Sequence, residues 1–222
     1  MIMFRFLLFP AKILLTVLSA LVLFILSFYC QTTLYSYPDT ERFSGPAFYN
    51  PYQQIPGTAL TANFHAHTSA YGGATNGDNS LEEMKDCYSR RGIDVAAISN
   101  YFQATPGEDL RVYEHGINLS KTHKLAINPA GELYFDYAVY QNTSQKQDII
   151  SRLRKKDALV VVAHPNMRNG HTLEDMTHLV EYHFTEIRSY YAYAEKYWDA
   201  ALQSGKLSWL MVNDDSHGVQ KQ

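Results

Sequence analysis

Apolar side chains fill the start of the chain almost without interruption. From Phe6 to Tyr29 nearly every residue is apolar, interrupted by Pro10 and Lys12, with Arg5 on the amino side and no acidic residue before Asp39. A stretch of this length suits a helix that spans a bilayer. Basic residues at its start predict an amino terminus inside and the rest of the chain exported.

A cleaved signal peptide is the alternative to an anchor. The run Ser27-Phe28-Tyr29-Cys30 makes a poor small-x-small cleavage site, and Tyr29 stands where a lipoprotein signal places a small residue. We therefore predict residues 1–30 as an uncleaved transmembrane signal anchor. The remaining chain is then held on the exported side, in a bacterial periplasm or at the cell exterior.

A proline- and tyrosine-rich segment follows the apolar block. Residues 31–57 contain Pro38, Pro46, Pro51 and Pro56 and have few periodic apolar positions, which is typical of an extended linker. We expect one folded domain over residues 58–222. The chain stops shortly after Gly218, so we also expect this domain to be truncated at its carboxyl end.

Within that domain, short apolar runs alternate with amphipathic segments. This rhythm predicts a largely parallel sheet with right-handed helical crossovers, buried on both faces. Strands are expected at Thr58–Phe64, Asp94–Ser99, Leu125–Asn128, Leu133–Tyr140, Leu159–Ala163, Phe184–Ile187 and Leu207–Val212. Helices are expected at Ser80–Arg91, Leu110–Lys121, Lys146–Lys155, Leu173–Tyr182 and Tyr193–Gln203, the first with Ser80 and Glu83 as a capping box.

Charge and cysteine content narrow the function classes. Without Arg5 and Lys12, 17 basic residues remain against 22 acidic ones, and this acidic balance gives no electrostatic reason to bind nucleic acid in bulk. The basic run 152–156 is expected to be a solvated helix end. Cys30 and Cys87 lie on opposite sides of the boundary between anchor and domain, so a disulfide framework is not expected.

Side chains that bind metals follow several of the predicted strands. His65 and His67, separated by one residue, point to the same side of the chain. His164 follows the aliphatic run 159–163, and Asp215 and His217 follow the run 209–212. Each motif alone is weak, because isolated histidines are usually exposed or structural. Together they predict one metal site at the carboxyl ends of the strands.

The conjunction of these motifs resembles the PHP (polymerase and histidinol phosphatase) superfamily of metal-dependent phosphoesterases, over about residues 59–218. The matching segments are His65-Ala66-His67-Thr68, Asp94-Val95-Ala96-Ala97-Ile98-Ser99-Asn100, Gly131-Glu132, Ala163-His164-Pro165 and Asp214-Asp215-Ser216-His217. The resemblance implies an α/β fold, a distorted (β/α)7 TIM-like barrel, with two or three divalent ions (Zn, Mn or Fe) at its mouth.

The resemblance also implies a role for each matching residue. His65, His67 and Asp215 would hold one ion. Glu132 would bridge to a second ion, His164 would bind that second ion, and His217 would serve a further position.

The chain departs from the family pattern after the second predicted strand. Ser99-Asn100-Tyr101 places a phenol where an imidazole ligand is expected, and a neutral tyrosine is a poor ligand for Zn or Mn. His115 is a possible substitute, although a histidine on a helix surface is the expectation there. Asp136 competes with Glu132 for the bridging role.

Clustered cations lower the pKa of water toward neutrality and neutralise phosphoryl oxygens. The sequence therefore predicts hydrolysis of a small phosphate mono- or diester, with His217 and Arg168 as catalytic residues. Arg168 would bind phosphate, and Arg188 is the second choice. His171, His178 and His183 have no strand-end placement and are expected to be structural or exposed.

Two other functions stay open. Activated water does not select its electrophile, so the same site would also suit hydrolysis of a C–N or C–O bond. Alternatively, the chain is a degenerate metal-binding module in which Tyr101 has abolished turnover and the tyrosine-rich surface binds a partner or glycan.

Overall fold

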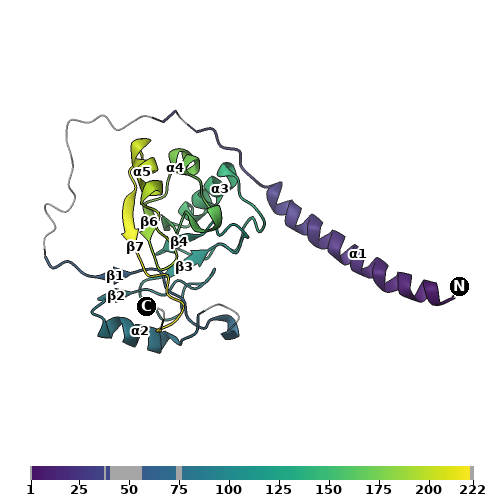
Figure 1. The fold of residues 1–222 in the computed structure, drawn as a ribbon, viewed down its shortest axis with the longest axis horizontal. Coiled ribbons are helices and arrows are strands. Elements are labelled where there is room, and N and C mark those ends of the chain that lie inside the picture. Colours follow the sequence, from purple (N-terminus) through teal and green to yellow (C-terminus); the bar gives the residue numbers. More distant parts are fainter. Residues whose placement is uncertain (1, 38, 41–56, 74–76, 221–222) are drawn as a thin grey trace.

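The computed structural model describes residues 2–37, 39–40, 57–73 and 77–220, and its course is shown in Figure 1. The helices are α1 (Ile2–Tyr29), α2 (Leu81–Arg90), α3 (Thr143–Arg154), α4 (Leu173–His178) and α5 (Glu195–Gln203). The strands are β1 (Ala62–Asn63), β2 (Val95–Ala96), β3 (Val112–His115), β4 (Lys124–Ile127), β5 (Leu159–Val162), β6 (Phe184–Arg188) and β7 (Trp209–Val212). Two short 3-10 helices are η2 (Tyr71–Gly73) and η3 (Met167–Asn169).

Helix α1 extends away from the rest of the protein (Figure 1). Among the described residues it alone is long and apolar enough to cross a membrane: Pro10–Tyr29 has a mean hydropathy of 2.4 and no buried residue. The predicted helix is confirmed, and its length and composition suit either an anchor or a signal sequence. Most of the predicted linker, residues 38 and 41–56, lies outside the described residues.

The strands form a mixed arrangement. β1 and β2 pair in parallel, and a second sheet has the order β3-β4-β5-β6-β7. In that sheet β5, β6 and β7 are parallel, whereas β4 runs antiparallel to both β3 and β5. The expected largely parallel sheet is therefore found only in part, because β3 and β4 form a hairpin-like pair instead of being joined by a helical crossover.

Two sequence predictions in the middle of the chain are wrong. The segment predicted as helix Leu110–Lys121 contains strand β3, all four residues of which are buried. The predicted strand Leu133–Tyr140 has no regular structure. Side-chain hydrogen bonds hold this segment in place of the backbone hydrogen bonds of a strand. Tyr113 Oη accepts from the Leu133 amide, and Tyr137 Oη donates to Asp148. Tertiary contacts override local propensity in both segments.

The other elements agree with the sequence patterns within a few residues. Helix α2 has the predicted capping box, in which Ser80 Oγ accepts from the Glu83 amide and the Glu83 carboxylate accepts from the Ser80 amide. Helix α3 has the same arrangement at Asn142 and Gln145. Each box satisfies donors at the helix start that have no partner within the helix.

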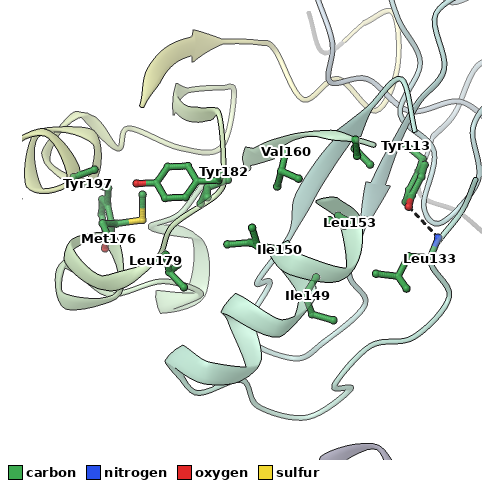
Figure 2. Close-up of a cluster of buried hydrophobic side chains, with 14 of the residues drawn as sticks. Tyr113, Leu133, Ile149, Ile150, Leu153, Val160, Met176, Leu179, Tyr182 and Tyr197 are labelled. Carbon is green, nitrogen blue, oxygen red and sulfur yellow. Dashed lines mark hydrogen bonds between the residues drawn. The ribbon is translucent and has the colours of Figure 1, made fainter. Parts of the chain in front are cut away.

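The main core lies between the five-stranded sheet and helices α3, α4 and α5, which all cover one side of it (Figure 1). Figure 2 shows Ile150 and Leu153 of α3 close to Val160 of β5, with Met176 of α4 and Leu179, which follows that helix, in the same cluster. Aliphatic side chains such as Leu125, Val161 and Ala163 make a second cluster on the opposite face of the same strands. The central strands β4 and β5 thus bury apolar side chains on both faces of the sheet.

Candidate metal centre

One end of the sheet gathers the polar side chains. His65 and His67 follow β1, Glu114 lies in β3, and His164 follows β5. Asp215 and His217 follow β7. His123 joins them although it precedes its strand, because β4 runs in the opposite direction and its amino end lies beside the carboxyl ends of its neighbours.

Glu114 lies at the centre of this cluster. Its Oε1 is 2.6 Å from His123 Nδ1, 3.1 Å from His164 Nε2 and 3.4 Å from His65 Nε2. Its Oε2 is 3.3 Å from His67 Nε2. One carboxylate therefore contacts four imidazoles that come from three separate parts of the chain.

Asp215 provides the second carboxylate. Its Oδ1 lies 3.2 Å from His65 Nε2, 3.5 Å from His67 Nε2 and 3.5 Å from His217 Nε2. The ring of His217 stacks on that of His67 with centroids 4.5 Å apart and an interplanar angle of 4°. Asp215 and His217 thus bring the segment after β7 to the same cluster.

The donor set fits divalent metal ions. Four overlapping groups of three residues each have ligand atoms within 4.8 Å of one another: His65-His67-Glu114, His65-His164-Asp215, His67-Asp215-His217 and Glu114-His123-His164. Within the described part of the chain, several of their buried atoms have no hydrogen-bond partner, including both ring nitrogens of His67, His65 Nε2 and Glu114 Oε2. Buried polar atoms are rarely left unsatisfied, and imidazole with carboxylate is the ligand combination of Zn, Mn and Fe sites.

A third carboxylate, Glu186 of β6, contacts the side chain of His65 and the backbone of His164. Its Oε1 lies 2.9 Å from His65 Nδ1 and accepts from Asn213 Nδ2 at 2.8 Å, while its Oε2 accepts from the His164 amide at 2.8 Å. A carboxylate on the far nitrogen of a ligand histidine fixes its ring and its tautomer. Glu186 therefore positions His65 so that its Nε2 faces Glu114 and Asp215.

Neighbouring charges in the cluster shift the pKa values of its side chains. Burial alone would raise the pKa of Glu114, but His123 and His65 outweigh this effect and hold that pKa well below its usual range. Burial also opposes protonation of His65, yet Asp215, Glu186 and Glu114 raise its pKa well above the usual value. At His123 burial dominates and lowers the pKa to about 4. The Glu114 carboxylate is thus ionised at neutral pH.

Tyr101 covers the cluster. Its ring stacks on His67 at 5.0 Å between centroids and lies edge-on to His123 at 5.6 Å. The phenol thus occupies the place where the sequence pattern departs from the PHP family. Lys121 Nζ lies 5.9 Å from the centre of the same ring, which brings one cation to the edge of the site.

The structure brings five of the six predicted metal ligands together: His65, His67, His164, Asp215 and His217. It does not bring Glu132 to them. Glu132 Oε1 accepts a hydrogen bond from Arg111 Nη2 at 2.7 Å, and its side chain is 23% exposed.

The alternatives that the sequence offered also lie elsewhere. Asp136 accepts from the Ile117 amide and from Gln141 Nε2. His115 is buried in a strand, not on a helix surface, and its Nε2 lies 2.9 Å from the Phe135 carbonyl oxygen.

The predicted phosphate-binding arginines are exposed. Arg168 lies in η3 with a left-handed backbone (φ 46°), close to the Lys121 turn, because Gly170 of the same segment packs against the Ser120 and Lys121 carbonyl oxygens. Arg188 pairs with Glu195 at 3.3 Å and lies over the ring of Tyr193. The segment that carries Arg168 thus packs against the Lys121 turn, and Arg188 is held by partners of its own.

Sequence analysis missed Glu114 and His123. Glu114 lay in a segment interpreted as a helix, where a carboxylate is an ordinary surface residue. The sequence signal against a helix is that Gly116 and Asn118 follow Glu114 within a few residues. Both residue types suit a turn and not the middle of a helix. His123 directly precedes the predicted strand that begins at Leu125, but only strand carboxyl ends were considered.

Comparison with known proteins supports the fold. No family model matches the chain, and no curated protein matches it. Among solved structures it is similar to a two-domain protein from Bacteroides vulgatus that contains a predicted PHP-like metal-dependent phosphoesterase, with a TM-score of 0.50 and 16% identity. The match covers 79% of this chain and 58% of that protein, so this chain spans less than two thirds of its length. At this identity the likeness concerns the fold alone.

Proposed function

We propose that this chain is a membrane-anchored, metal-dependent phosphoesterase of PHP type. The observation that carries the proposal is the shared position of Glu114, whose two oxygens face ligand atoms of two different groups, His65-His67-Glu114 and Glu114-His123-His164. One carboxylate between two sets of imidazoles is the arrangement expected of a bridged pair of cations.

In this proposal Glu114 bridges the two sites. His65, His67 and Asp215 complete the first, and His123 and His164 complete the second. His217 stands beside the first site and serves a further position. Bound cations, Zn, Mn or Fe, would supply the positive charge that activates water and neutralises phosphoryl oxygens.

The chain's own residues carry the rest of the reaction. Glu186 holds His65 in its ring orientation. Lys121 brings a cation to the ring of Tyr101, and Arg168, whose segment packs against the Lys121 turn, is proposed to bind the phosphate with it. The oxygen of water joins phosphorus, the bond from phosphorus to the ester oxygen breaks, and the departing alcohol takes up a proton. His217 is our choice for that proton donor, because its ring reaches the cluster while its Nδ1 has no hydrogen-bond partner among the described residues.

The proposal extends to the architecture. We propose that all seven strands form one distorted barrel over residues 58–222, following an anchor at 1–30 and a linker at 31–57. Two isolated parallel bridges support this: Tyr101 with Glu114 joins the end of β2 to β3, and Ala66 with Ser216 joins the end of β1 to the segment after β7. The catalytic domain would lie on the exported side of the membrane.

A second function, a binding module without turnover, is favoured by the ring of Tyr101, which stacks directly on the proposed ligand His67. Both functions predict bound metal, but only the first predicts hydrolysis.

The test is to purify the chain with its anchor in detergent, measure its metal content, and assay a panel of phosphate mono- and diesters with Mn or Zn added. We expect two ions per chain and hydrolysis that is lost in His65→Ala. The matched control His178→Ala, on the surface of α4 and outside the cluster, is expected to keep both. Metal binding without hydrolysis of any ester would favour the binding module. Hydrolysis that persists in His65→Ala would refute the site.

A further inference from the structure

The carboxyl end of α1 is fastened to the folded domain. Tyr29 Oη accepts from the Val139 and Tyr140 amides at 3.1 and 3.0 Å, and donates to the Tyr140 carbonyl oxygen at 3.0 Å. The rings of Phe28 and Phe135 lie 5.3 Å apart. These contacts set the domain at a defined position on the end of the apolar helix.

A groove of about 430 Å³ lies at this junction, which we call the junction groove. Phe24, Ile25 and Phe28 of α1 form one wall, and the domain side includes Ile117 and Tyr134. Its volume lies within the range of small-molecule sites. Its lining is almost entirely apolar, so it suits hydrocarbon better than a hydrated ligand.

The groove lies at the level of the bilayer interface if α1 spans the membrane. The apolar span ends at Tyr29, and at 1.5 Å per residue Phe24 is about 7.5 Å further along the helix axis toward the hydrocarbon. Wall residues of α1 are therefore placed where acyl chains meet head groups.

The domain surface around the groove is also apolar. Tyr134 is 70% exposed, Leu119 68% and Ile117 64%. The segments that carry these residues lie side by side, because the Ile117 amide donates to Asp136 Oδ2 and the Leu119 amide donates to the Ala138 carbonyl oxygen. A gathered apolar surface next to a membrane helix is suited to contact lipid.

The groove adjoins the metal centre. Tyr71 and Phe102 line it, and Tyr71 Oη donates to the Tyr101 carbonyl oxygen at 2.6 Å. The ring of Tyr101 in turn stacks on His67. A single residue, Tyr101, therefore separates apolar lining from metal-binding side chains.

We propose that the substrate is a phosphate ester of a membrane lipid, with its hydrocarbon tail in the junction groove and its phosphate at the metal centre. The inference rests on the proposed function and names its substrate class. For a phosphomonoester, the oxygen of water joins phosphorus, the bond between phosphorus and the lipid oxygen breaks, and the lipid alcohol takes the proton and stays in the bilayer while phosphate leaves. Tail binding then contributes to turnover, because interactions remote from the reacting atoms help to position them.

The test uses the full chain reconstituted in phosphatidylcholine vesicles with Mn or Zn. Release of phosphate from phosphatidic acid in the same vesicles is compared with release from glycerol 3-phosphate in solution. We expect the lipid ester to be cleaved at least about tenfold faster than the soluble ester. Ile117→Asn is expected to lower this ratio severalfold, whereas the matched control Leu207→Asn, 77% exposed and outside the groove, leaves it unchanged.

A second measurement does not depend on turnover. Phosphatidic acid with a photoactivatable group on its acyl chain is expected to label the 117–119 and 134–140 segments, and Ile117→Asn should reduce that labelling. Cleavage of the soluble ester with no preference for the lipid, or an unchanged ratio in Ile117→Asn, would overturn the inference and leave the proposed function intact. Failure to cleave either ester overturns the inference, while the panel of soluble phosphate esters decides the proposed function separately. Cross-linking of the groove to a second copy's α1 instead of lipid would also overturn the inference.

Discussion

Two regions of this protein contain buried charged side chains, and they differ in how completely those side chains are hydrogen-bonded. Behind the sheet, Lys146 donates to Asp175 at 2.5 Å, and the carboxylate also accepts from Thr143 Oγ1 and the Thr172 amide. In the candidate metal centre, Glu114 and its surrounding histidines have several buried nitrogens and oxygens without a hydrogen-bond partner among the residues that the structure describes. The first region satisfies its charges internally, whereas the second is arranged for charges that come from outside.

This difference separates structural from functional use of the same residue types. A buried ion pair with all its hydrogen bonds completed contributes to one defined fold. Unsatisfied ligand atoms that converge on a common centre reduce stability unless something binds them. Four substitutions test the contrast, in order of the expected effect.

Glu114→Gln should have the largest effect. The change removes the charge that the two proposed ion sites share, so we expect loss of bound metal and of hydrolysis, with the fold retained. Elemental analysis of the purified variant and its circular dichroism spectrum measure this. Glu132→Gln is the matched control, since Glu132 pairs with Arg111 outside the cluster. A variant that keeps its full metal content would exclude Glu114 as the bridge.

Asp175→Asn should act on stability and not on metal content. Lys146 would be left as an uncompensated buried charge, a change that typically costs about 3–5 kcal/mol. Chemical denaturation of the parent and variant gives the free energy of unfolding. Unchanged stability, or a loss of metal together with stability, would show that the two regions are not separable.

The same pair predicts a pH dependence for the parent protein. Burial would raise the pKa of Asp175, but its bonds to Lys146 and neighbours lower it below the usual value. Its contribution is therefore complete above the unfolded pKa of about 3.9 and is lost as the pH falls through the lower native value. Asp175→Asn should show a weaker loss of stability with acid in that window. If the free energy of unfolding fell equally with acid in the parent and in Asp175→Asn, this assignment would be contradicted.

Glu186→Gln should weaken metal binding without abolishing it. Glu186 touches His65 and the His164 amide, not the centre of the cluster. Loss of such a supporting carboxylate typically lowers metal affinity about 10–100-fold. Metal titration should show this shift, while hydrolysis at saturating metal stays near that of the parent. Abolished hydrolysis at saturating metal would mean that Glu186 takes part directly.

Arg111→Ala should have the smallest effect. Its bond to Glu132 joins two partly exposed side chains, with 40% and 23% exposure. Such pairs contribute at most about 1 kcal/mol. Thermal unfolding should show little change, and metal content should be that of the parent. A loss of metal here would restore Glu132 as a residue of the centre.

How far the site was predictable depended on the strand that carries each residue. His65, His67, His164, Asp215 and His217 follow apolar runs, and the geometry of parallel strands is enough to bring such positions to one edge. Glu114 was hidden because β3 buries charged and apolar residues alike, which removes the alternation that identifies a strand. His123 was hidden by the direction of β4, which no local pattern records.

The fold was predictable to a similar degree. Capping at Ser80 and the aliphatic run of β5 were readable from the sequence because each depends on neighbouring residues. The pairing of β4 between β3 and β5 depends on contacts between residues far apart in the chain. Side-chain contacts such as Tyr137 with Asp148 replaced the strand expected at Leu133–Tyr140.

The bridge between Ala66 and Ser216 has a consequence for how the protein matures. It ties together segments that leave the ribosome far apart in time, and each segment brings proposed metal ligands. In the proposed metal centre, a chain that ends before Asp215 lacks the second carboxylate. The complete proposed centre can therefore form only after synthesis has passed His217 and the two segments have paired.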